Sequence, residues 1–281
     1  IRRCGKSTLF DQFISYLKDS GVNEKQIIKI NLEDAVFNFE DYMELYNYIL
    51  DKLDLTKKNY VFLDEVQNVK DFQKAVDSLY IKKNVDVYIT GSKAYLLSGE
   101  LATLLSGRYI EIKMLPLSFK EFITEFDNNN YYELFLNYME FGGKPGCVNL
   151  LKTNPNNVDT YIDGIFSTVV YKDIMARNNI TNKLLLESVL KFVYDSIDSR
   201  VSTKKISDTL TSKGTLTSNH TVENYLVAFL ESFLIYKAKR FDVKGKKMLS
   251  RDYKYYAIDT GLRSYLLGKK SVVIRGIYLK I

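Results

Sequence analysis

The sequence predicts an α/β protein in which a parallel β-sheet is covered by helices, followed by an all-helical segment and a smaller domain of helices and a hairpin. Two features of the first 122 residues predict the sheet: short apolar runs of strand length, and amphipathic helical patterns between them. A third feature marks the remainder, because beyond residue 122 Phe and Tyr recur at helical spacing and the alternation stops.

The first part alternates helices and strands along the chain. In residues 6–19 the apolar side chains lie three and four positions apart, which indicates one buried helix face. Strands are predicted at residues 26–32, 59–66, 85–92 and 108–114, and further helices at residues 40–53 and 70–82. Strands that alternate with helices of this length favour a parallel sheet with helices on both faces.

The second part is helical and ends in two extended runs. Helical patterns cover residues 119–141, 157–175, 183–197, 201–214 and 217–234. The runs LIYKAKRFD and KYYAID flank a basic turn, VKGKK, and predict a β-hairpin. Helices followed by a hairpin are the element order of a winged-helix domain, which we expect at residues 183–265.

The composition excludes several classes of protein. The chain has 281 residues, enough for two domains, and no apolar run approaches the ~18 residues that span a bilayer. It shows no basic-then-apolar leader, so we expect a cytoplasmic protein without membrane contact. Two cysteines, Cys4 and Cys147, and a single histidine argue against a zinc site or a Ser-His-Asp triad. We expect His220 to be a polar residue on a helix surface.

The opening residues IRRCGKSTLF contain the end of a phosphate-binding loop, whose full pattern is G-x-x-x-x-G-K-[ST]. We expect Gly5 to let backbone N–H groups wrap an anion, Lys6 to reach the terminal phosphates and the Ser7 hydroxyl to bind magnesium. Thr8 is the last residue of the GKST tetrad. The following helix points its positive end at the same phosphates. The tetrad alone also fits an ordinary helix start with Ser7 near the N-cap.

A second element makes the loop assignment more specific. The apolar run YVFLDE ends in Asp64 and Glu65. An acidic residue at a strand end beside the loop holds magnesium, here Asp64, and a neighbouring glutamate such as Glu65 polarises the attacking water. The alternative is a buried strand whose carboxylates face solvent.

The next predicted strand and two arginines supply further candidates. In ITGS, Ser92 is our first candidate for a residue that senses the γ-phosphate and Thr90 is the second, although either hydroxyl would equally serve as a helix cap. Arg108 is the first candidate for an arginine finger and Arg177 the alternative, and either is equally compatible with a surface ion pair. Arg2 and Arg3 lie in the loop, where they would touch phosphate or face solvent.

Seven segments in order resemble one family over about residues 1–265. They are RRCGKSTL, INLED, VFLDEVQNV, ITGSKAYLLSGELATLLSGRY, LPLSFKEF, YKDI and YYAIDTGLR. The chain resembles the prokaryotic AAA-type ATPases that carry a C-terminal domain of uncharacterised function. This resemblance implies an ASCE-type P-loop fold and ATP and Mg²⁺ as ligands. It assigns residues 5–8 to the nucleotide loop, Asp64 and Glu65 to the magnesium and water-activating pair, and Ser92 to the sensor.

The sequence departs from that family at both ends, so we expect a truncated chain. The first loop glycine and the strand before it would precede Ile1, and the family continues beyond the last residues, SVVIRGIYLKI. We therefore expect a core that lacks its first strand, with a weakened nucleotide site. The expected division is a P-loop ATPase core at 1–122, a helical connector at 123–182, the winged-helix domain at 183–265 and a tail at 266–281.

Three functional hypotheses follow. The first is an ATPase that hydrolyses MgATP, with the winged-helix part serving a protein partner, a second copy or DNA. The second is a DNA-binding regulator with a degenerate ATPase core, and the third is an inactive fragment.

The charge pattern bears on the second hypothesis. The net charge is +6, which permits contact with nucleic acid without requiring it. Residues 219–234 carry no Lys or Arg, whereas the hairpin at 237–254 is rich in both. Its basic residues are Lys237, Lys239, Arg240, Lys244, Lys246, Lys247, Arg251 and Lys254. This pattern favours non-specific phosphate contact over base readout, or else a solvated hairpin.

Overall fold

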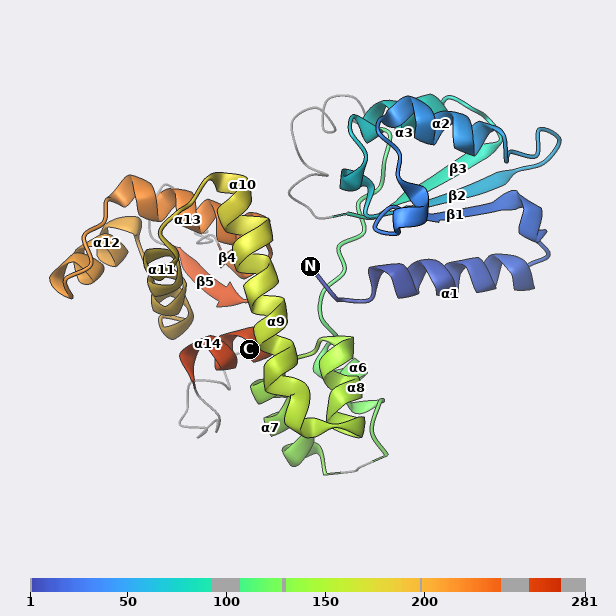
Figure 1. Ribbon diagram of the computed structural model, residues 1–281. Helices are drawn as coiled ribbons and strands as arrows, with labels where there is room; N and C mark the ends of the chain where they lie inside the picture. Colours follow the sequence, from blue (N-terminus) through green and yellow to red (C-terminus); the bar gives the residue numbers. More distant parts are fainter. Residues whose placement is uncertain (1, 92–106, 128–129, 198, 239–252, 269–281) are drawn as a thin grey trace, which may run out of the picture. The chain divides into compact units, whose positions relative to one another are not determined.

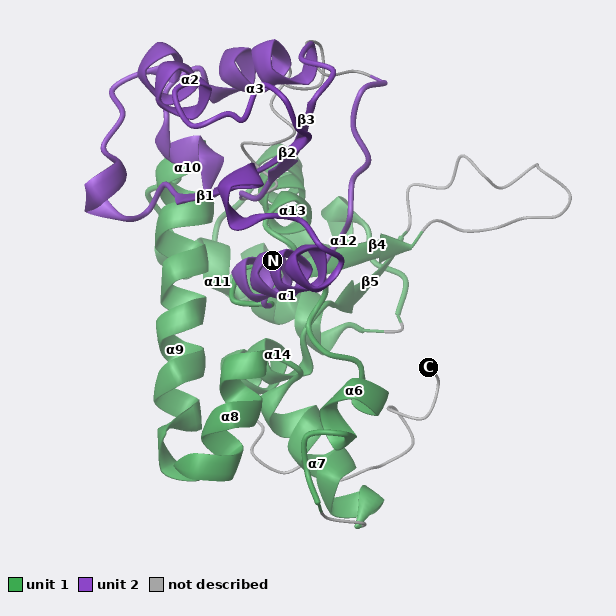
Figure 2. Ribbon diagram, turned by 90° about the vertical axis from the view of Figure 1, so that its right-hand side faces the viewer, with its two compact units in different colours: residues 1–4, 115–281 green, residues 5–114 purple. Residues whose placement is uncertain are grey.

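The computed structural model describes residues 2–91, 107–127, 130–197, 199–238 and 253–268. It forms two compact units, distinguished by colour in Figure 2. We call residues 5–114 the sheet unit, and residues 1–4 with 115–281 the helical unit.

Three parallel strands form the centre of the sheet unit, in the order β1-β2-β3. They are β1 (Ile27–Asn31), β2 (Asn59–Asp64) and β3 (Val85–Ile89). The register aligns Ile28 with Val61, and Val61 with Val87. The central strand β2 is buried on both faces, which explains its near-continuous apolar sequence. The predicted parallel α/β architecture is confirmed.

Helices cover both faces of this sheet (Figure 1). The helices are α1 (Lys6–Asp19), α2 (Tyr42–Leu50) and α3 (Phe72–Tyr80), and the short 3₁₀ turns are η1 (Glu24–Gln26), η2 (Ala35–Phe37) and η3 (Val66–Asn68). Because strand side chains alternate, Val61 and Leu63 pack against α2 and α3, whereas Phe62 packs against Phe10 and Phe13 of α1 on the opposite face.

The prediction of a strand at 108–114 is wrong. Residues 109–114 have no regular secondary structure, and Ile110 and Ile112 are 91% and 76% exposed. A strand needs a neighbour to complete its ladder of hydrogen bonds, and within the described residues the sheet contains only β1, β2 and β3. Alternating apolar residues therefore did not suffice to form a strand here.

The helical unit begins with short packed helices. These are α6 (Phe119–Ile123), α7 (Tyr131–Phe141), α8 (Pro145–Thr153), η4 (Pro155–Asn157) and α9 (Val158–Thr168). The chain continues directly from α9 through a π-helical turn, η5 (Val169–Met175), into α10 (Ala176–Asn178), so that the three form one long helix in Figure 1. The predicted helix at 157–175 is therefore present, with a wider turn in its last part.

The remaining elements follow the predicted order of helices and hairpin. They are α11 (Lys183–Asp195), α12 (Thr203–Ser212), α13 (Asn219–Glu231), β4 (Ile235–Ala238), β5 (Lys254–Ala257) and α14 (Thr260–Leu267). Strands β4 and β5 pair antiparallel, and Ser202 and Ser218 cap their helices through the side chain. His220 lies exposed on α13, as expected. One apolar core extends from Cys147 to Leu266.

Both cysteines, Cys4 and Cys147, are buried free thiols. Burial raises the pKa of the Cys147 thiol from 9.0 to about 12, which keeps it protonated at neutral pH.

A buried ion pair joins two distant segments of the helical unit. Lys144 Nζ lies 2.6 Å from Asp259 Oδ1, and the two side chains are 1% and 3% exposed. Asp259 also accepts hydrogen bonds from the N–H groups of Leu262 at 2.9 Å and Gly143 at 3.4 Å. Only glycine fits at position 143, because a Cβ there would lie 2.1 Å from the carbonyl oxygen of Leu117. The junction thus depends on both charge pairing and close backbone approach.

We predict that Asp259→Asn lowers the free energy of unfolding of the helical unit by about 3–5 kcal/mol, because it leaves the Lys144 ammonium buried without a counter-charge. Urea denaturation measures the effect. The matched control is Glu125→Gln, which breaks the exposed pair between Lys152 and Glu125 at 3.5 Å and should cost less than about 1 kcal/mol. Equal losses in the two variants would contradict the prediction.

Candidate nucleotide site

The loop glycine adopts the backbone conformation that the motif requires. Gly5 has φ 86° and ψ 21°, in the left-handed region that costs other residues more than glycine. It directly precedes α1, and its carbonyl accepts the first helical hydrogen bond, from Leu9 N–H at 2.9 Å. The first amides of a helix have no carbonyl partner within the helix and favour an anion. Ser7 and Thr8 are exposed in this first turn.

The structure brings Lys6 and Glu65 together from two distant points in the sequence. Lys6 Nζ lies 3.7 Å from Glu65 Oε1, and the side chains are 19% and 17% exposed. Gln67 Nε2 donates a hydrogen bond to the other carboxylate oxygen, Glu65 Oε2, at 2.6 Å. Both oxygens of Glu65 therefore have a donor or cation beside them. The sequence analysis did not select Gln67. Its position two residues beyond Glu65, in the same tight turn, was the signal that could have identified it.

Backbone geometry directs Glu65 at the end of β2. Its φ of 53° and ψ of 51° lie in the left-handed region, which costs a non-glycine residue about 1–3 kcal/mol. The conformation is held on its C-terminal side, where Val66 N–H donates to Thr90 O at 3.0 Å. Such a strained residue at a strand end is common where a side chain must be aimed at a ligand.

Asp64 is only 2% exposed and forms a hydrogen bond with Thr90. The Thr90 hydroxyl donates to Asp64 Oδ1, while it accepts from Glu65 N–H at 3.2 Å. Thr90 therefore contacts both members of the acidic pair, although it was only our second candidate. Ser92, our first candidate, lies outside the described residues.

The two candidate arginines contact other groups. Arg108 Nη1 binds Asp77 Oδ1 of α3 at 2.8 Å, and its guanidinium lies over the ring of Tyr80. Arg177 lies 3.9 Å from Glu231 in the helical unit. Both arginines thus form surface ion pairs, which the sequence analysis gave as the alternative to the role of an arginine finger.

The acidic pair suits a magnesium ion held partly by phosphate. Asp64 and the Ser7 hydroxyl are hard oxygen donors of the kind Mg²⁺ prefers, and Mg²⁺ in such sites is held by few protein ligands plus phosphate and water. Within the part of the chain that the structure describes, no group of three or more His, Cys, Asp or Glu residues forms a metal site by itself. The donor set therefore fits a metal that arrives with the nucleotide.

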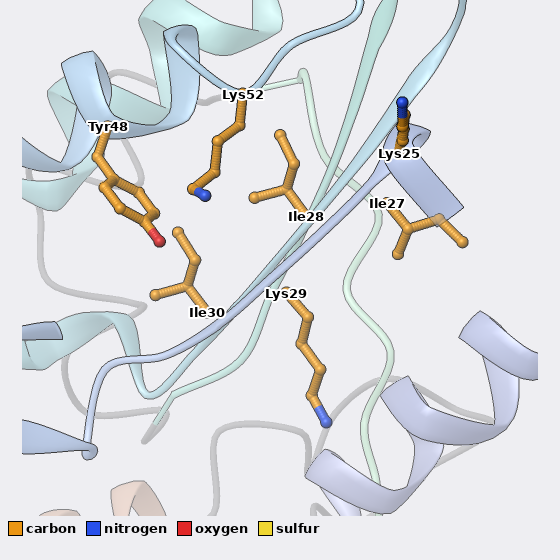
Figure 3. A pocket seen from close by; sticks show the side chains of 7 residues that line it. All are labelled: Lys25, Ile27, Ile28, Lys29, Ile30, Tyr48 and Lys52. Carbon is orange, nitrogen blue, oxygen red and sulfur yellow. The ribbon is translucent and has the colours of Figure 1, made fainter. Parts of the chain in front are cut away.

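A separate groove of about 400 Å³ runs along the outer edge of β1 (Figure 3). In the close-up, Ile28 and Ile30 lie on the same side of β1 as Tyr48 and Lys52, whereas Lys29 points to the opposite side. Lys29 is paired with Asp11, and the Lys52 ammonium lies 4.8 Å from the centre of the Tyr48 ring. Lysines on an edge strand discourage pairing with another chain. None of the candidate nucleotide residues lines this groove.

Comparisons with known proteins identify the family of the chain. An AAA domain model matches residues 1–123, and a model for a domain of unknown function matches residues 132–272. An uncharacterised protein of Haemophilus influenzae is 40% identical over 276 residues, covering 96% of this chain and 68% of that protein. The chain belongs to the AAA-type P-loop ATPases that carry a C-terminal domain of unknown function.

Two more proteins resemble this AAA protein. An uncharacterised protein of Methanocaldococcus jannaschii is 31% identical over 274 residues, and the chain spans 59% of that relative's length. Among solved structures, a Walker-type ATPase of Pyrococcus abyssi aligns with a TM-score of 0.58 and 16% identity, covering 95% of this chain and 89% of that one. At this identity the likeness shows the fold alone. No helix among the described residues is long and apolar enough to cross a membrane.

We predict that Thr90→Val lowers the free energy of unfolding of the sheet unit by about 1–3 kcal/mol, because the buried Asp64 carboxylate loses its hydroxyl donor while side-chain shape is kept. Thr90→Ser keeps the hydroxyl and should stay closer to the parent. Urea unfolding followed by circular dichroism compares the three proteins. A valine variant as stable as the serine variant would show that the Thr90 hydroxyl does not hold Asp64.

Proposed function

We propose that this AAA protein binds MgATP at the loop of residues 5–8 and hydrolyses its terminal phosphoanhydride bond. The observation that carries the proposal is the approach of Lys6 to Glu65 beside the buried Asp64, all at the carboxyl end of β2. A lysine after a loop glycine, next to a strand-end Asp-Glu pair, is the set of groups that phosphoryl transfer to water needs.

Each residue has a separate role in the proposed reaction. The Gly5 turn and the first amides of α1 hold the phosphate oxygens, and Lys6 neutralises the β- and γ-phosphates. Ser7 and Asp64 hold magnesium, which when bound withdraws charge from the phosphate oxygens. Glu65 orients the attacking water and accepts its proton. Thr90 fixes Asp64 and the backbone of Glu65.

Two further roles in the proposed reaction are a γ-phosphate sensor and an arginine finger. Ser92 is our proposed γ-phosphate sensor, and Arg108 our proposed finger, with Arg177 as the alternative. A finger stabilises transition-state charge and is worth roughly 10³–10⁵ in rate. Arg108 would have to leave Asp77 to act, either on its own nucleotide or on that of a second copy of the chain.

We further propose that residues 183–265 are a winged-helix module that contacts a partner or the phosphate backbone of DNA. Helix α13 exposes His220 and Glu223 and has no Lys or Arg, which argues against base readout by this helix. Of the hairpin residues in 237–254, Lys237 and Lys254 lie in the described strands, and the other six basic residues lie outside the described part. The affinity for duplex DNA, measured over a range of salt concentrations, tests this contact, because binding through phosphates weakens as salt rises.

Substitution of the loop lysine tests nucleotide binding. Lys6→Ala should weaken the affinity for a fluorescent ATP analogue by roughly 10- to 100-fold, because charge-assisted bonds to phosphate are worth about 1.5–3 kcal/mol. Lys18→Ala is the matched control, since Lys18 lies in the last turn of the same helix and pairs with Glu24. Undiminished affinity in Lys6→Ala would refute the loop assignment.

Substitution of the strand-end glutamate tests hydrolysis. Glu65→Gln should retain nucleotide binding while phosphate release slows by roughly 10²–10⁴-fold, because an amide has the shape of the carboxylate but cannot accept the proton of water. Glu24→Gln, at an exposed ion pair of the same unit, is the control. If Glu65→Gln releases phosphate at the parent rate, the proton acceptor is another residue.

A further inference from the structure

The residues directly before the loop glycine belong to the helical unit. Residues 1–4 group with residues 115–281, whereas Gly5 begins the sheet unit (Figure 2). The chain therefore passes from one unit to the other between Cys4 and Gly5, one peptide bond before the residues that we propose bind phosphate. Arg2 contacts Asp173, Arg3 contacts Tyr161 and Cys4 contacts Arg2, and all of these partners belong to the helical unit.

Arg2 makes the strongest of these contacts, a two-pronged ion pair with Asp173. Its Nε donates to Asp173 Oδ2 at 2.6 Å and its Nη2 donates to Oδ1 at 2.7 Å. The side chains are 30% and 11% exposed, so solvent screens this pair less than a surface one. A planar guanidinium that binds both oxygens of a carboxylate fixes orientation as well as distance.

The next two residues are also held. The Arg3 guanidinium lies 5.4 Å from the centre of the Tyr161 ring, and its backbone has a φ of 57°. Cys4 is 4% exposed, and its thiol donates to Arg2 O. A non-glycine residue in the left-handed region costs energy unless its surroundings hold it, and here the residues on both sides are held.

Asp173 lies in the π-helical turn η5, between α9 and α10. Its neighbours Val169, Val170 and Ile174 are buried in the main core of the helical unit, which anchors the turn. A π-helical turn inserts an extra residue, re-aims the side chains around it and often occurs at functional sites. Arg177, four residues further on, lies 3.9 Å from Glu231, a longer approach than either contact between Arg2 and Asp173.

We propose that Asp173 is a positioning residue for nucleotide binding: by fixing Arg2 it holds residues 2–4, and through them sets the backbone path into Gly5 and Lys6. The proposal rests on the proposed function of residues 5–8. It couples nucleotide occupancy to the long helix α9–η5–α10, which lies in the domain of unknown function. Because such coupling is reciprocal, a ligand that moves this helix also changes nucleotide affinity.

The test is a double-mutant cycle in the affinity for a fluorescent MgATP analogue, measured well below the melting temperature of every variant. Asp173→Asn should weaken binding about tenfold, and Arg2→Lys should weaken it less, because lysine keeps the charge but not the fork. The double variant should bind no more weakly than Asp173→Asn alone, because the two residues act as one unit. Asp163→Asn is the control: Asp163 lies on α9 and accepts a bond from the Tyr265 hydroxyl.

Two outcomes of the cycle overturn the proposal. Unchanged or tighter binding in Asp173→Asn shows that the pair does not hold the loop for nucleotide, even if the variant melts earlier. Effects of Arg2→Lys and Asp173→Asn that simply add show that Arg2 contacts the nucleotide independently of Asp173.

Hydrogen exchange in the absence of nucleotide tests whether Asp173 holds residues 2–4 in place. The Leu9 amide, which donates to the Gly5 carbonyl at 2.9 Å, should exchange faster in Asp173→Asn than in the parent, whereas the amides of 59–68 should not change. Equal exchange of the Leu9 amide in both proteins overturns the proposal. A parent chain that binds no MgATP refutes the proposed function instead, and the exchange result still decides whether Asp173 holds residues 2–4.

Discussion

The parallel pairing of β2 with β3 is the constraint on which the candidate site depends. Parallel strands bring their carboxyl ends to one edge of the sheet, and the register that aligns Leu63 with Ile89 places Asp64 beside Thr90. A slip of one residue would turn every side chain of β2 to the other face, so that Asp64 would lose its partner and Phe62 its place against α1. Because β2 is almost continuously apolar and buried on both faces, the packing of Phe62 against α1 and the hydrogen bond of Asp64 fix this register, rather than alternation along the strand. The positions of the candidate site residues therefore depend on how the strands and helices pack.

Electrostatics then organise the site. Two of the three basic residues near Gly5 have a carboxylate partner: Arg2 has Asp173 within the helical unit, and Lys6 has Glu65 within the sheet unit. The two carboxylates differ in setting, because Glu65 sits in a strained turn at a strand end and Asp173 in a π-helical turn of a long helix. An anion at the loop would compete with Glu65 for Lys6, whereas Asp173 pairs with Arg2, which precedes residues 5–8 of the loop.

The helical unit is organised around a different kind of contact. Lys144 and Asp259, far apart in the sequence, form a buried ion pair at a junction where glycines allow backbones to touch. A buried ion pair contributes little net stability compared with apolar residues, but removing one member is costly. We therefore regard this pair as specifying how the α7–α8 connection meets the start of α14. The same unit contains η5, and the buried residues of that turn anchor it, and with it Asp173, in the apolar core.

The sequence by itself determined most local structure and the identity of the candidate residues. The spacing of apolar residues predicted β1, β2, β3 and most helices, since periodicity depends only on nearby residues. The GKST and LDE motifs identified Lys6, Asp64 and Glu65 without any structure, because their chemistry is carried by residue type and local spacing. The fold and the family followed from these motifs in order.

What only the tertiary structure decided concerns contacts between segments far apart in the chain. Residues 109–114 have the alternation of a strand but form none, because a strand depends on a neighbour and not on its own pattern. The contact of Thr90 with the acidic pair and the ion pair between Arg2 and Asp173 were likewise visible only in the structure. Sequence spacing contains no information on such pairings, since they are fixed by the packing of whole elements, and a charged side chain binds whichever partner that packing brings within reach.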